Sequence, residues 1–304
     1  MTDTTALVIG EALVDAVVRP DGERSEHPGG SPANVALGLA RLGRDAGLLT
    51  WLADDARGDL VREHLAASGV RVLTGEGGPE RTPMATAHLD ADGSASYDFD
   101  LTWDLPIADV GQPVVVHTGS IGAVLEPGGA KVADLLAAHR DTATITYDPN
   151  LRPALMRPAD ETLPLVEHLI GLSDVVKVSD EDLAWLHPGV PTEEIARDWA
   201  SRGPGLVVVT LGGSGALAVT AGGAELAVTA PRVQVADTVG AGDSFMSGLI
   251  DGLWSAGLVG ADRREALRSI DLATVQEVLI RCVRIAAITV SRTGANPPTT
   301  AELG

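Results

Sequence analysis

The chain has 304 residues, 45% hydrophobic and 21% charged, which suffices for a full core in one large α/β domain or two smaller ones. Its formal net charge of −20 repels nucleic acid and anionic membranes, so we expect neither as a partner. The single cysteine, Cys282, excludes an internal disulfide and a cysteine-rich metal site, and it fits the reducing cytoplasm that we expect as the location.

The N-terminal segment predicts two extended stretches. Residues 6–10 form an apolar run that ends at a glycine, and residues 11–18 are again extended in pattern. No basic region precedes the first run, and no apolar run approaches ~18 residues, so we expect neither a signal peptide nor a membrane helix. Asp15 follows closely behind the first strand, where α/β sheets hold ligands. It either binds ligand hydroxyls or is an ordinary solvated strand acid, and on its own the second reading is favoured.

A glycine pair and a helix follow. Gly29 and Gly30 allow close approach of the backbone to a ligand, and we expect Ser31 to cap a helix that continues to residue 42. Asn34 in the first turn can both give and accept hydrogen bonds, as sugar hydroxyls require. The alternative is a turn and a cap without any ligand.

Strands at 47–52 and 70–73 around a helix at 57–67 give a βαβ rhythm, which favours a parallel sheet. The rhythm then breaks, because residues 82–89 and 94–99 alternate around Asp90-Ala91-Asp92-Gly93 and predict a hairpin. Together with the extended segment after Gly10, this hairpin would form a small second sheet that covers the site. Its aromatic residues Tyr97 and Phe99 would wall off a ligand or pack against a second subunit.

Polar residues follow two further predicted strands. Strands at 114–117 and 142–147 flank a helix at 131–139, and Asp148, Asn150 and Arg152 come directly after the second strand, as ligand contacts would. A strand at 174–178 leads into Ser179-Asp180-Glu181-Asp182, which opens a helix. These acids either interact favourably with the positive end of the helix dipole or hold a hydrated Mg²⁺. On local grounds we prefer the first interpretation.

Residues 206–211 predict an apolar strand, and Gly212-Gly213-Ser214-Gly215 leads into strands at 216–220 and 224–229. The glycine spacing formally matches a dinucleotide fingerprint, but that fingerprint needs a helix next, so we reject it. The only lysines, Lys131 and Lys177, do not follow a glycine, which excludes a Walker-type loop. We therefore expect phosphate chemistry to depend on backbone amides, arginine and a metal.

Residues 237–245, Asp-Thr-Val-Gly-Ala-Gly-Asp-Ser-Phe, carry the strongest indication of chemistry. They follow an extended-looking run over 225–235 and open an apolar-periodic helix, so Gly240, Ala241 and Gly242 would present free N–H groups to an anion, most naturally phosphate. Asp243 inside this site would accept a proton from an incoming nucleophile. The alternative is a helix entry with an aspartate cap. A helix at 275–290 and a loop at 292–298 close the chain.

Two motifs in this order resemble the signatures of the ribokinase-like (PfkB) carbohydrate kinases. They are residues 29–34, with Gly38 and Gly43 after them, and residues 237–243. Residues 10–15, 148–152 and 294–298 also look like the bacterial fructokinases of that family. The resemblance implies an α/β fold: a three-layer sandwich in which helices flank a mostly parallel central sheet, plus a small β-sheet lid. It also implies one domain over residues 1–304, with a lid formed by residues 11–29 and 82–103, approximately.

The resemblance implies roles for individual residues. Asp243 would be the general base on the primary hydroxyl of a sugar, inside an anion hole built from the amides of residues 240–243. Arg152 would contact substrate or phosphate. The remaining sugar-side residues would be Asp15, Gly29, Gly30, Asn34, Tyr97 and Phe99.

The resemblance also implies nucleotide and ion sites. Ser179, Thr210, Gly212, Gly215 and Gly242 would bind ATP. The family's Asn-x-x-Glu metal motif aligns with Ser179-x-x-Asp182 and differs at both ends, so Mg²⁺ is expected at Asp182 with help from Glu181. K⁺ is expected at Asp237, Val239 and Gly294.

The function implied is an ATP-dependent sugar kinase, with fructose as the leading substrate and fructose 6-phosphate as its product. Ribokinase and 2-keto-3-deoxygluconate kinase are the alternatives within the family, and the latter should need extra basic or hydroxyl groups near the lid. A catalytically silent sugar- or nucleotide-binding regulator is the alternative from a different class. The exposed lid edges make a homodimer the expected assembly.

Overall fold

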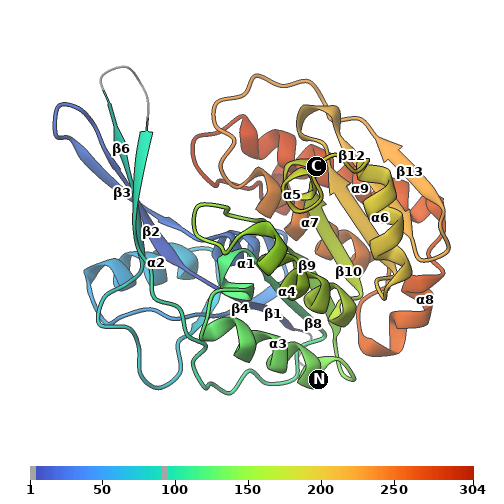
Figure 1. Ribbon diagram of the computed structural model, residues 1–304, viewed down its shortest axis with the longest axis horizontal. Helices are drawn as coiled ribbons and strands as arrows, with labels where there is room; N and C mark the ends of the chain where they lie inside the picture. The colour runs from blue at the N-terminus through green and yellow to red at the C-terminus, as the bar shows by residue number, and fades with distance from the viewer. Residues whose placement is uncertain (1–4, 91–94) are drawn as a thin grey trace.

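Two β-sheets organise the chain in the computed structural model, which describes residues 5–90 and 95–304 (Figure 1). The larger sheet has nine strands in the order β13-β12-β11-β10-β9-β8-β1-β4-β5. All pairings from β5 to β11 are parallel, and β12 and β13 add antiparallel strands at one edge. The predicted mostly parallel sheet is therefore confirmed. Its strands are β1 (Thr5–Ile9), β4 (Asp45–Leu49), β5 (Arg71–Leu73), β8 (Val115–Gly119), β9 (Thr144–Asp148), β10 (Val175–Ser179), β11 (Leu206–Thr210), β12 (Ala216–Thr220) and β13 (Glu225–Val228).

Helices cover both faces of this sheet. Most of its strands are therefore buried on both sides. One core cluster joins the sheet to α1 (Ser31–Arg41), α2 (Ala56–Ala66), α7 (Ala241–Ser255), α8 (Arg264–Arg268) and α9 (Leu272–Val290). The other joins it to α3 (Gly128–His139), α4 (Ala159–Leu172), α5 (Asp180–Leu186) and α6 (Thr192–Ser201). The predicted three-layer α/β sandwich is confirmed. In the described part of the chain, none of the helices is long and apolar enough to cross a membrane.

The smaller sheet has four strands in the order β3-β2-β6-β7 and projects from the main body at the left of Figure 1. Its strands are β2 (Leu13–Val18), β3 (Arg24–Gly29), β6 (Met84–Leu89) and β7 (Ala95–Asp100). Asp15 pairs with His27 on one side and with Ala85 on the other, and Ala85 pairs with Phe99. Partners in register share a face of a sheet, so Asp15 and Phe99 lie on the same face. That this sheet acts as a lid stays a prediction.

Several boundaries differ from the sequence-based expectations. Gly30 is the N-cap of α1, with a φ of 103°, and Ser31 is the first helical residue rather than the cap. The extended run expected over residues 225–235 ends as a strand at Val228, and an irregular segment leads from there to α7. The expected hairpin turn at residues 90–93 falls largely outside the described residues. Ser94, the expected first residue of the second strand, lies outside them as well.

Candidate active site

The carboxylate of Asp243 lies where the N-terminal ends of α1 and α7 meet, and both helices start at the carboxyl edge of the large sheet. Its Oδ1 accepts a hydrogen bond from the Ser31 hydroxyl at 2.7 Å, and its Oδ2 accepts one from Asn34 Nδ2 at 2.8 Å. Only 6% of Asp243 is exposed. The structure thus brings together the two glycine motifs that lie about two hundred residues apart in the chain.

Asn150 completes this network from a third direction. Its Nδ2 donates to Ser31 Oγ at 2.7 Å and to Asp243 Oδ1 at 3.3 Å. Asn150 follows β9 and has a φ of 38°, an uncommon backbone conformation for a residue other than glycine. Such strain persists only where the surroundings hold it, and it gathers at functional sites. Sequence analysis treated Ser31 only as a cap. The signal it missed was a hydroxyl beside the glycines at a strand-to-helix junction.

The start of α7 has the free amides that an anion site requires. Gly240 is its N-cap in the left-handed region, with a φ of 75°, and a Cβ atom there would lie 2.6 Å from that of Ala295. The Ala241 amide reaches Thr238 O at a long 3.3 Å. Within the described residues, the amides of Gly240, Gly242 and Asp243 have no hydrogen-bond acceptor. Three unpaired N–H groups therefore stand at the positive end of the α7 dipole.

The sugar-side residues predicted from sequence lie on the small sheet, at the start of α1 and in the loop after β9. A Cβ atom at Gly29 would come within 2.1 Å of Asp15 Oδ2, so glycine leaves room for that carboxylate. Asp15 keeps an exposed edge, yet the loss of hydration among the surrounding atoms raises its pKa, against the lowering effects of Arg152 and His27. The Asp243 charge raises it further. Arg152 bonds through Nη1 to Asn150 and is otherwise exposed.

The two aromatic residues of the small sheet are exposed rather than buried against a ligand wall. Tyr97 is 61% and Phe99 38% exposed, and their rings stack with centroids 6.1 Å apart. Neither lines the large pocket described below. A role in walling off a ligand or in a subunit contact stays a prediction for both.

Glu11 is a buried acid at the junction of the two sheets. Its Oε2 accepts the Gly122 amide at 2.8 Å, and burial raises its pKa to about 7, although hydrogen bonds from Ser120 and the backbone act against this. The backbone carbonyl of Glu11 lies 2.5 Å from the position of a Cβ atom at Gly30. This close packing fixes the glycine pair beside β2.

A pocket of about 830 Å³ opens next to the free amides. Its polar side includes Asn150, Arg152, Thr210, Gly212, Gly215 and Gly242, and its apolar side includes Val233, Val235, Val283, Ala286, Ala287 and Val290. The predicted nucleotide residues Ser179, Thr210, Gly212, Gly215 and Gly242 thus all lie on one pocket. Its apolar wall comes from α9 and the irregular segment before α7, which sequence analysis did not connect with a ligand.

Two acids in the lining of this pocket were predicted to hold Mg²⁺. Asp182 and Ser179 form a capping box at the start of α5, and Asp182 Oδ1 also accepts the Leu151 amide at 3.0 Å. Both Asp182 oxygens therefore have partners, as the reading based on the helix dipole expects. Glu181 is exposed at the pocket. Asp148 Oδ1, close to these acids, is a buried carboxylate oxygen without a partner among the described atoms. The exposed carboxylate of Glu181 suits a hydrated Mg²⁺, whereas Asp148 is fully buried and does not line the pocket.

The residues predicted for K⁺ lie together. Asp237 accepts the Val239 amide through Oδ1 at 3.0 Å and the Gly294 amide through Oδ2 at 2.9 Å. These backbone bonds keep the pKa of Asp237 below its usual range. The carboxylate joins the segment before α7 to the loop after α9, and each oxygen retains a lone pair for a cation.

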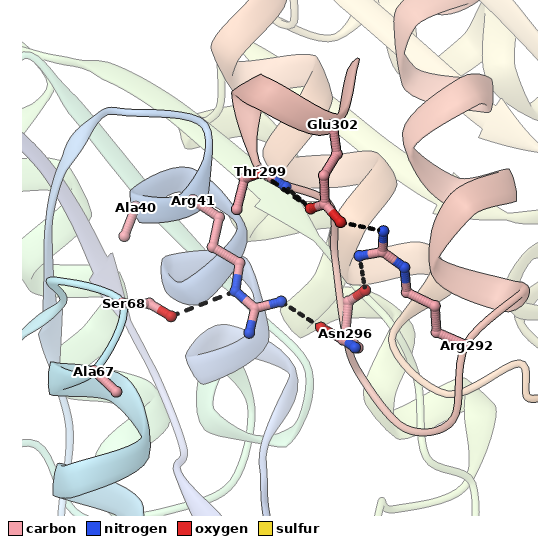
Figure 2. A pocket seen from close by; sticks show the side chains of 8 residues that line it. All are labelled: Ala40, Arg41, Ala67, Ser68, Arg292, Asn296, Thr299 and Glu302. Atoms are coloured by element: carbon pink, nitrogen blue, oxygen red, sulfur yellow. Dashed lines mark hydrogen bonds and ion pairs between the residues drawn. The ribbon is translucent and has the colours of Figure 1, made fainter. Parts of the chain in front are cut away.

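A second, shallower pocket explains how that loop is held (Figure 2). Arg41 at the end of α1 donates to Ser68, to Asn296 Oδ1 and to the Pro297 carbonyl. Arg292 pairs with Glu302 at 2.6 Å. The polar groups in Figure 2 largely satisfy one another, so they anchor the loop that carries Gly294.

Lys177 is a pocket residue for which the sequence patterns predicted no role. It lines the large pocket, although phosphate chemistry was expected to use only amides, arginine and a metal. Its Nζ lies 2.8 Å from Asp148 Oδ2. Burial raises the pKa of Asp148 to about 6, despite this ammonium. Asp148, expected as a ligand contact, is instead fully buried behind the pocket.

Comparisons with known proteins fit this geometry. The family model of the pfkB family carbohydrate kinases matches residues 3–302. The fructokinase of Rhizobium leguminosarum bv. trifolii is 34% identical over 261 residues, which is 81% of this chain and 79% of the relative. An aminoimidazole riboside kinase from Salmonella typhimurium is 32% identical over 256 residues, which is 80% of this chain and 79% of the relative.

Solved structures agree over the whole fold. The fructokinase from Vibrio cholerae O395 with fructose, ADP and calcium ion has a TM-score of 0.81 at 25% identity, covering 100% of this chain and 98% of the other. A double mutant of that protein with fructose, ADP and potassium ion has a TM-score of 0.82 at 26% identity, covering 99% and 97%. Because the family model spans almost every residue, this chain belongs to the pfkB family of carbohydrate kinases.

Proposed function

We propose that this protein transfers the γ-phosphoryl group of ATP to a primary hydroxyl of a small sugar, with fructose as the leading substrate. The observation that carries the proposal is the placement of Asp243. Its carboxylate lies beside the free amides of Gly240 and Gly242 at the start of α7, and Asn34 donates to it from the sugar side. A proton acceptor next to an anion site is the arrangement that phosphoryl transfer to an alcohol needs.

In the proposed reaction, the sugar hydroxyl replaces one of the donors that now bond Asp243 and gives its proton to that carboxylate. The hydroxyl oxygen attacks the γ-phosphorus in line, and the bond between that phosphorus and the β,γ-bridging oxygen breaks. The amides at the start of α7 stabilise the charge that develops on the phosphoryl oxygens. Mg²⁺, expected near Glu181 and Asp182 at the pocket lining, would supply further charge neutralisation when bound.

The nucleotide fits the large pocket in one orientation. The apolar wall of Val283, Ala287 and Val290 suits a purine base, whereas the amides of α7 suit phosphate. Phosphates at the glycine end and the base at the α9 end place the γ-phosphate next to Asp243. In this orientation, Thr210, Gly212 and Gly215 would contact the nucleotide, as the sequence predicts.

Fructose is favoured over a sugar acid because the sugar side is rich in carboxyl groups. Asp15 and Asp243 lie on it, and Arg152 and His27 partly offset the charge around Asp15. A substrate carboxylate, as in 2-keto-3-deoxygluconate, would be repelled by these acids. The identity to fructokinase relatives supports the same choice.

The test is an ATP-consumption assay on the purified protein with fructose, ribose, 2-keto-3-deoxygluconate, glucose, adenosine and aminoimidazole riboside. We expect the highest kcat/KM with fructose and a product phosphorylated at its primary hydroxyl, identified by NMR. If the protein turns over only another compound of the panel, that compound and not fructose is the substrate. Binding of sugar and ATP without turnover would favour the silent regulator.

The K⁺ site is tested in the same assay. With Asp237 ionised beside the amides of Val239 and Gly294, we expect activity to rise when K⁺ replaces Na⁺ at constant ionic strength. Equal activity in the two buffers would remove the K⁺ requirement and leave the kinase proposal intact.

A further inference from the structure

Lys177 is a buried lysine that none of the roles above uses. It lies on β10, and only 2% of it is exposed. Side chains alternate along a strand, so Lys177 shares a face with Val175, which packs in the core cluster that contains α7. Lys177 lies two residues nearer to the carboxyl edge of the sheet, where α7 begins. A charged group thus occupies the end of an otherwise apolar row.

The ammonium group has more donors than the protein satisfies. It offers three N–H groups, and its bond to Asp148 Oδ2 is the one acceptor that the described residues provide. Burying an ammonium costs several kcal/mol unless ion pairing and hydrogen bonds compensate. Because Lys177 lines the large pocket, a ligand there can accept the remaining donors.

The ammonium also lies against the anion site. A Cβ atom at Gly242 would be 2.9 Å from Lys177 Nζ. Outside the local backbone of α7 and the chain neighbours of Gly242, Lys177 Nζ is the only heavy atom of the described residues within 4 Å of that position. The free amide of Gly242 and the Lys177 ammonium therefore converge on one region. Three basic side chains, Arg152, Lys177 and Arg232, line this pocket against Asp180, Glu181 and Asp182. Lys177 alone among them is buried.

We propose that Lys177 is a catalytic residue whose ammonium donates to the terminal phosphate of the bound nucleoside triphosphate from beneath Gly242. The proposal rests on the proposed function. As the sugar oxygen bonds to the γ-phosphorus and the bond to the β,γ-bridging oxygen breaks, the proton of the sugar passes to Asp243. Lys177 keeps its own proton and neutralises charge on the transferred group, and the diphosphate leaves with the electron pair.

Binding by nucleotides of different length tests this contact. We would measure the affinity of AMP, ADP and the β,γ-imido analogue of ATP for the wild-type protein and for Lys177→Met. A contact to the terminal phosphate predicts that the triphosphate analogue alone loses affinity, by about tenfold, as expected for one hydrogen bond to a charged group. The kcat should fall ~10²-fold or more, as for the loss of one oxyanion donor. Equal losses for all three nucleotides, or no loss, would overturn the proposal.

Lys131→Met is the matched control, because Lys131 is the only other lysine and forms an exposed ion pair with Asp104 at 2.5 Å. It should leave all affinities and kcat unchanged. A wild-type protein that phosphorylates no sugar would refute the proposed function. Normal triphosphate binding and turnover by Lys177→Met, with an active wild type, would refute only the role of Lys177.

A measurement on the wild-type protein keeps the test decisive if Lys177→Met does not fold. Labelling lysine with ¹⁵N at Nζ gives two side-chain NMR signals, because the chain has two lysines. We expect the imido analogue to shift the Lys177 signal more than ADP does, with the Lys131 signal unchanged. Identical Lys177 shifts with ADP and with the analogue would overturn the contact to the terminal phosphate.

Discussion

The two sheets contribute to the candidate site in opposite ways. At the carboxyl edge of the large sheet, Asp243, Ser31, Asn34 and Asn150 form a network in which both carboxylate oxygens of Asp243 already accept hydrogen bonds. The small sheet contributes Asp15, Tyr97 and Phe99, all of them exposed. One half is therefore preorganised by hydrogen bonds within the chain, whereas the side chains of the other half remain exposed. Changes in the first half should mainly lower kcat, and changes in the second should mainly alter binding.

The largest effect is expected from Asp243→Asn in the preorganised half. The amide keeps the shape of the side chain and loses the proton acceptor, so sugar and ATP affinity should persist while kcat falls ~10²-fold or more. Steady-state kinetics and isothermal titration calorimetry measure the two quantities. Asp54→Asn, at a fully exposed side chain, is the control. Near-normal turnover of Asp243→Asn would refute its role as the base.

Glu11→Gln tests the junction between the two halves through stability. The folded-state pKa of Glu11 is about 7, against 4.5 as its ordinary value, so the folded protein holds this proton more tightly than the unfolded chain. Its contribution to stability is full below pH 4.5 and is lost as the pH rises through about 7. Because the amide of Glu11→Gln does not ionise, the variant does not undergo this loss of stability, which is on the order of 3 kcal/mol at pH 8.

Urea unfolding of the wild type and Glu11→Gln from pH 4.5 to 8.5 measures this difference. His117, whose pKa burial lowers to about 3, and Asp148 titrate equally in both proteins and cancel. A stability difference between the two proteins that stays constant with pH would show that folding does not raise the pKa of Glu11.

Asp15→Ala probes the small-sheet half. If this carboxylate bonds sugar hydroxyls, the KM for the sugar should rise roughly tenfold or more, because hydrogen bonds to charged groups contribute about 1.5–3 kcal/mol. The kcat and the KM for ATP should change little. Glu23→Ala, in the exposed turn between β2 and β3, serves as the control. An unchanged sugar KM would return Asp15 to the reading as a solvated strand acid.

The smallest effect on chemistry is expected from replacing both Tyr97 and Phe99 by serine. Because both rings are exposed, unfolding stability should change by no more than about 0.5 kcal/mol. If the lid forms the dimer contact, sedimentation velocity should show a wild-type dimer and a monomeric variant. Ile107→Ser, at a side chain that is 91% exposed, should leave the dimer intact. A monomeric wild type with a raised sugar KM in the variant would instead favour the ligand wall.

Local patterns predicted the elements of the fold well where their periodicity was clear. The strands of the large sheet and helices α1, α2, α3, α7 and α9 were all expected near their observed ranges. Helices α4 and α6 were not anticipated. Helix α4 follows Pro158, has no side-chain cap and contains Pro164, a residue that removes a helical hydrogen bond. Helix α6 likewise follows a proline that gives no side-chain cap.

The sequence alone determined the candidate anion site and its acid, because Gly240 to Asp243 are adjacent and a loop that enters a helix exposes their amides by local geometry. The capping box of Ser179 and Asp182 is equally local. Tertiary structure decided the rest. Ser31 and Asn150 reach Asp243 across 212 and 93 residues, and Lys177 reaches Asp148 across 29. Such pairings depend on which strands become neighbours in the sheet and which helices cover each face, and no local pattern of residues specifies that order.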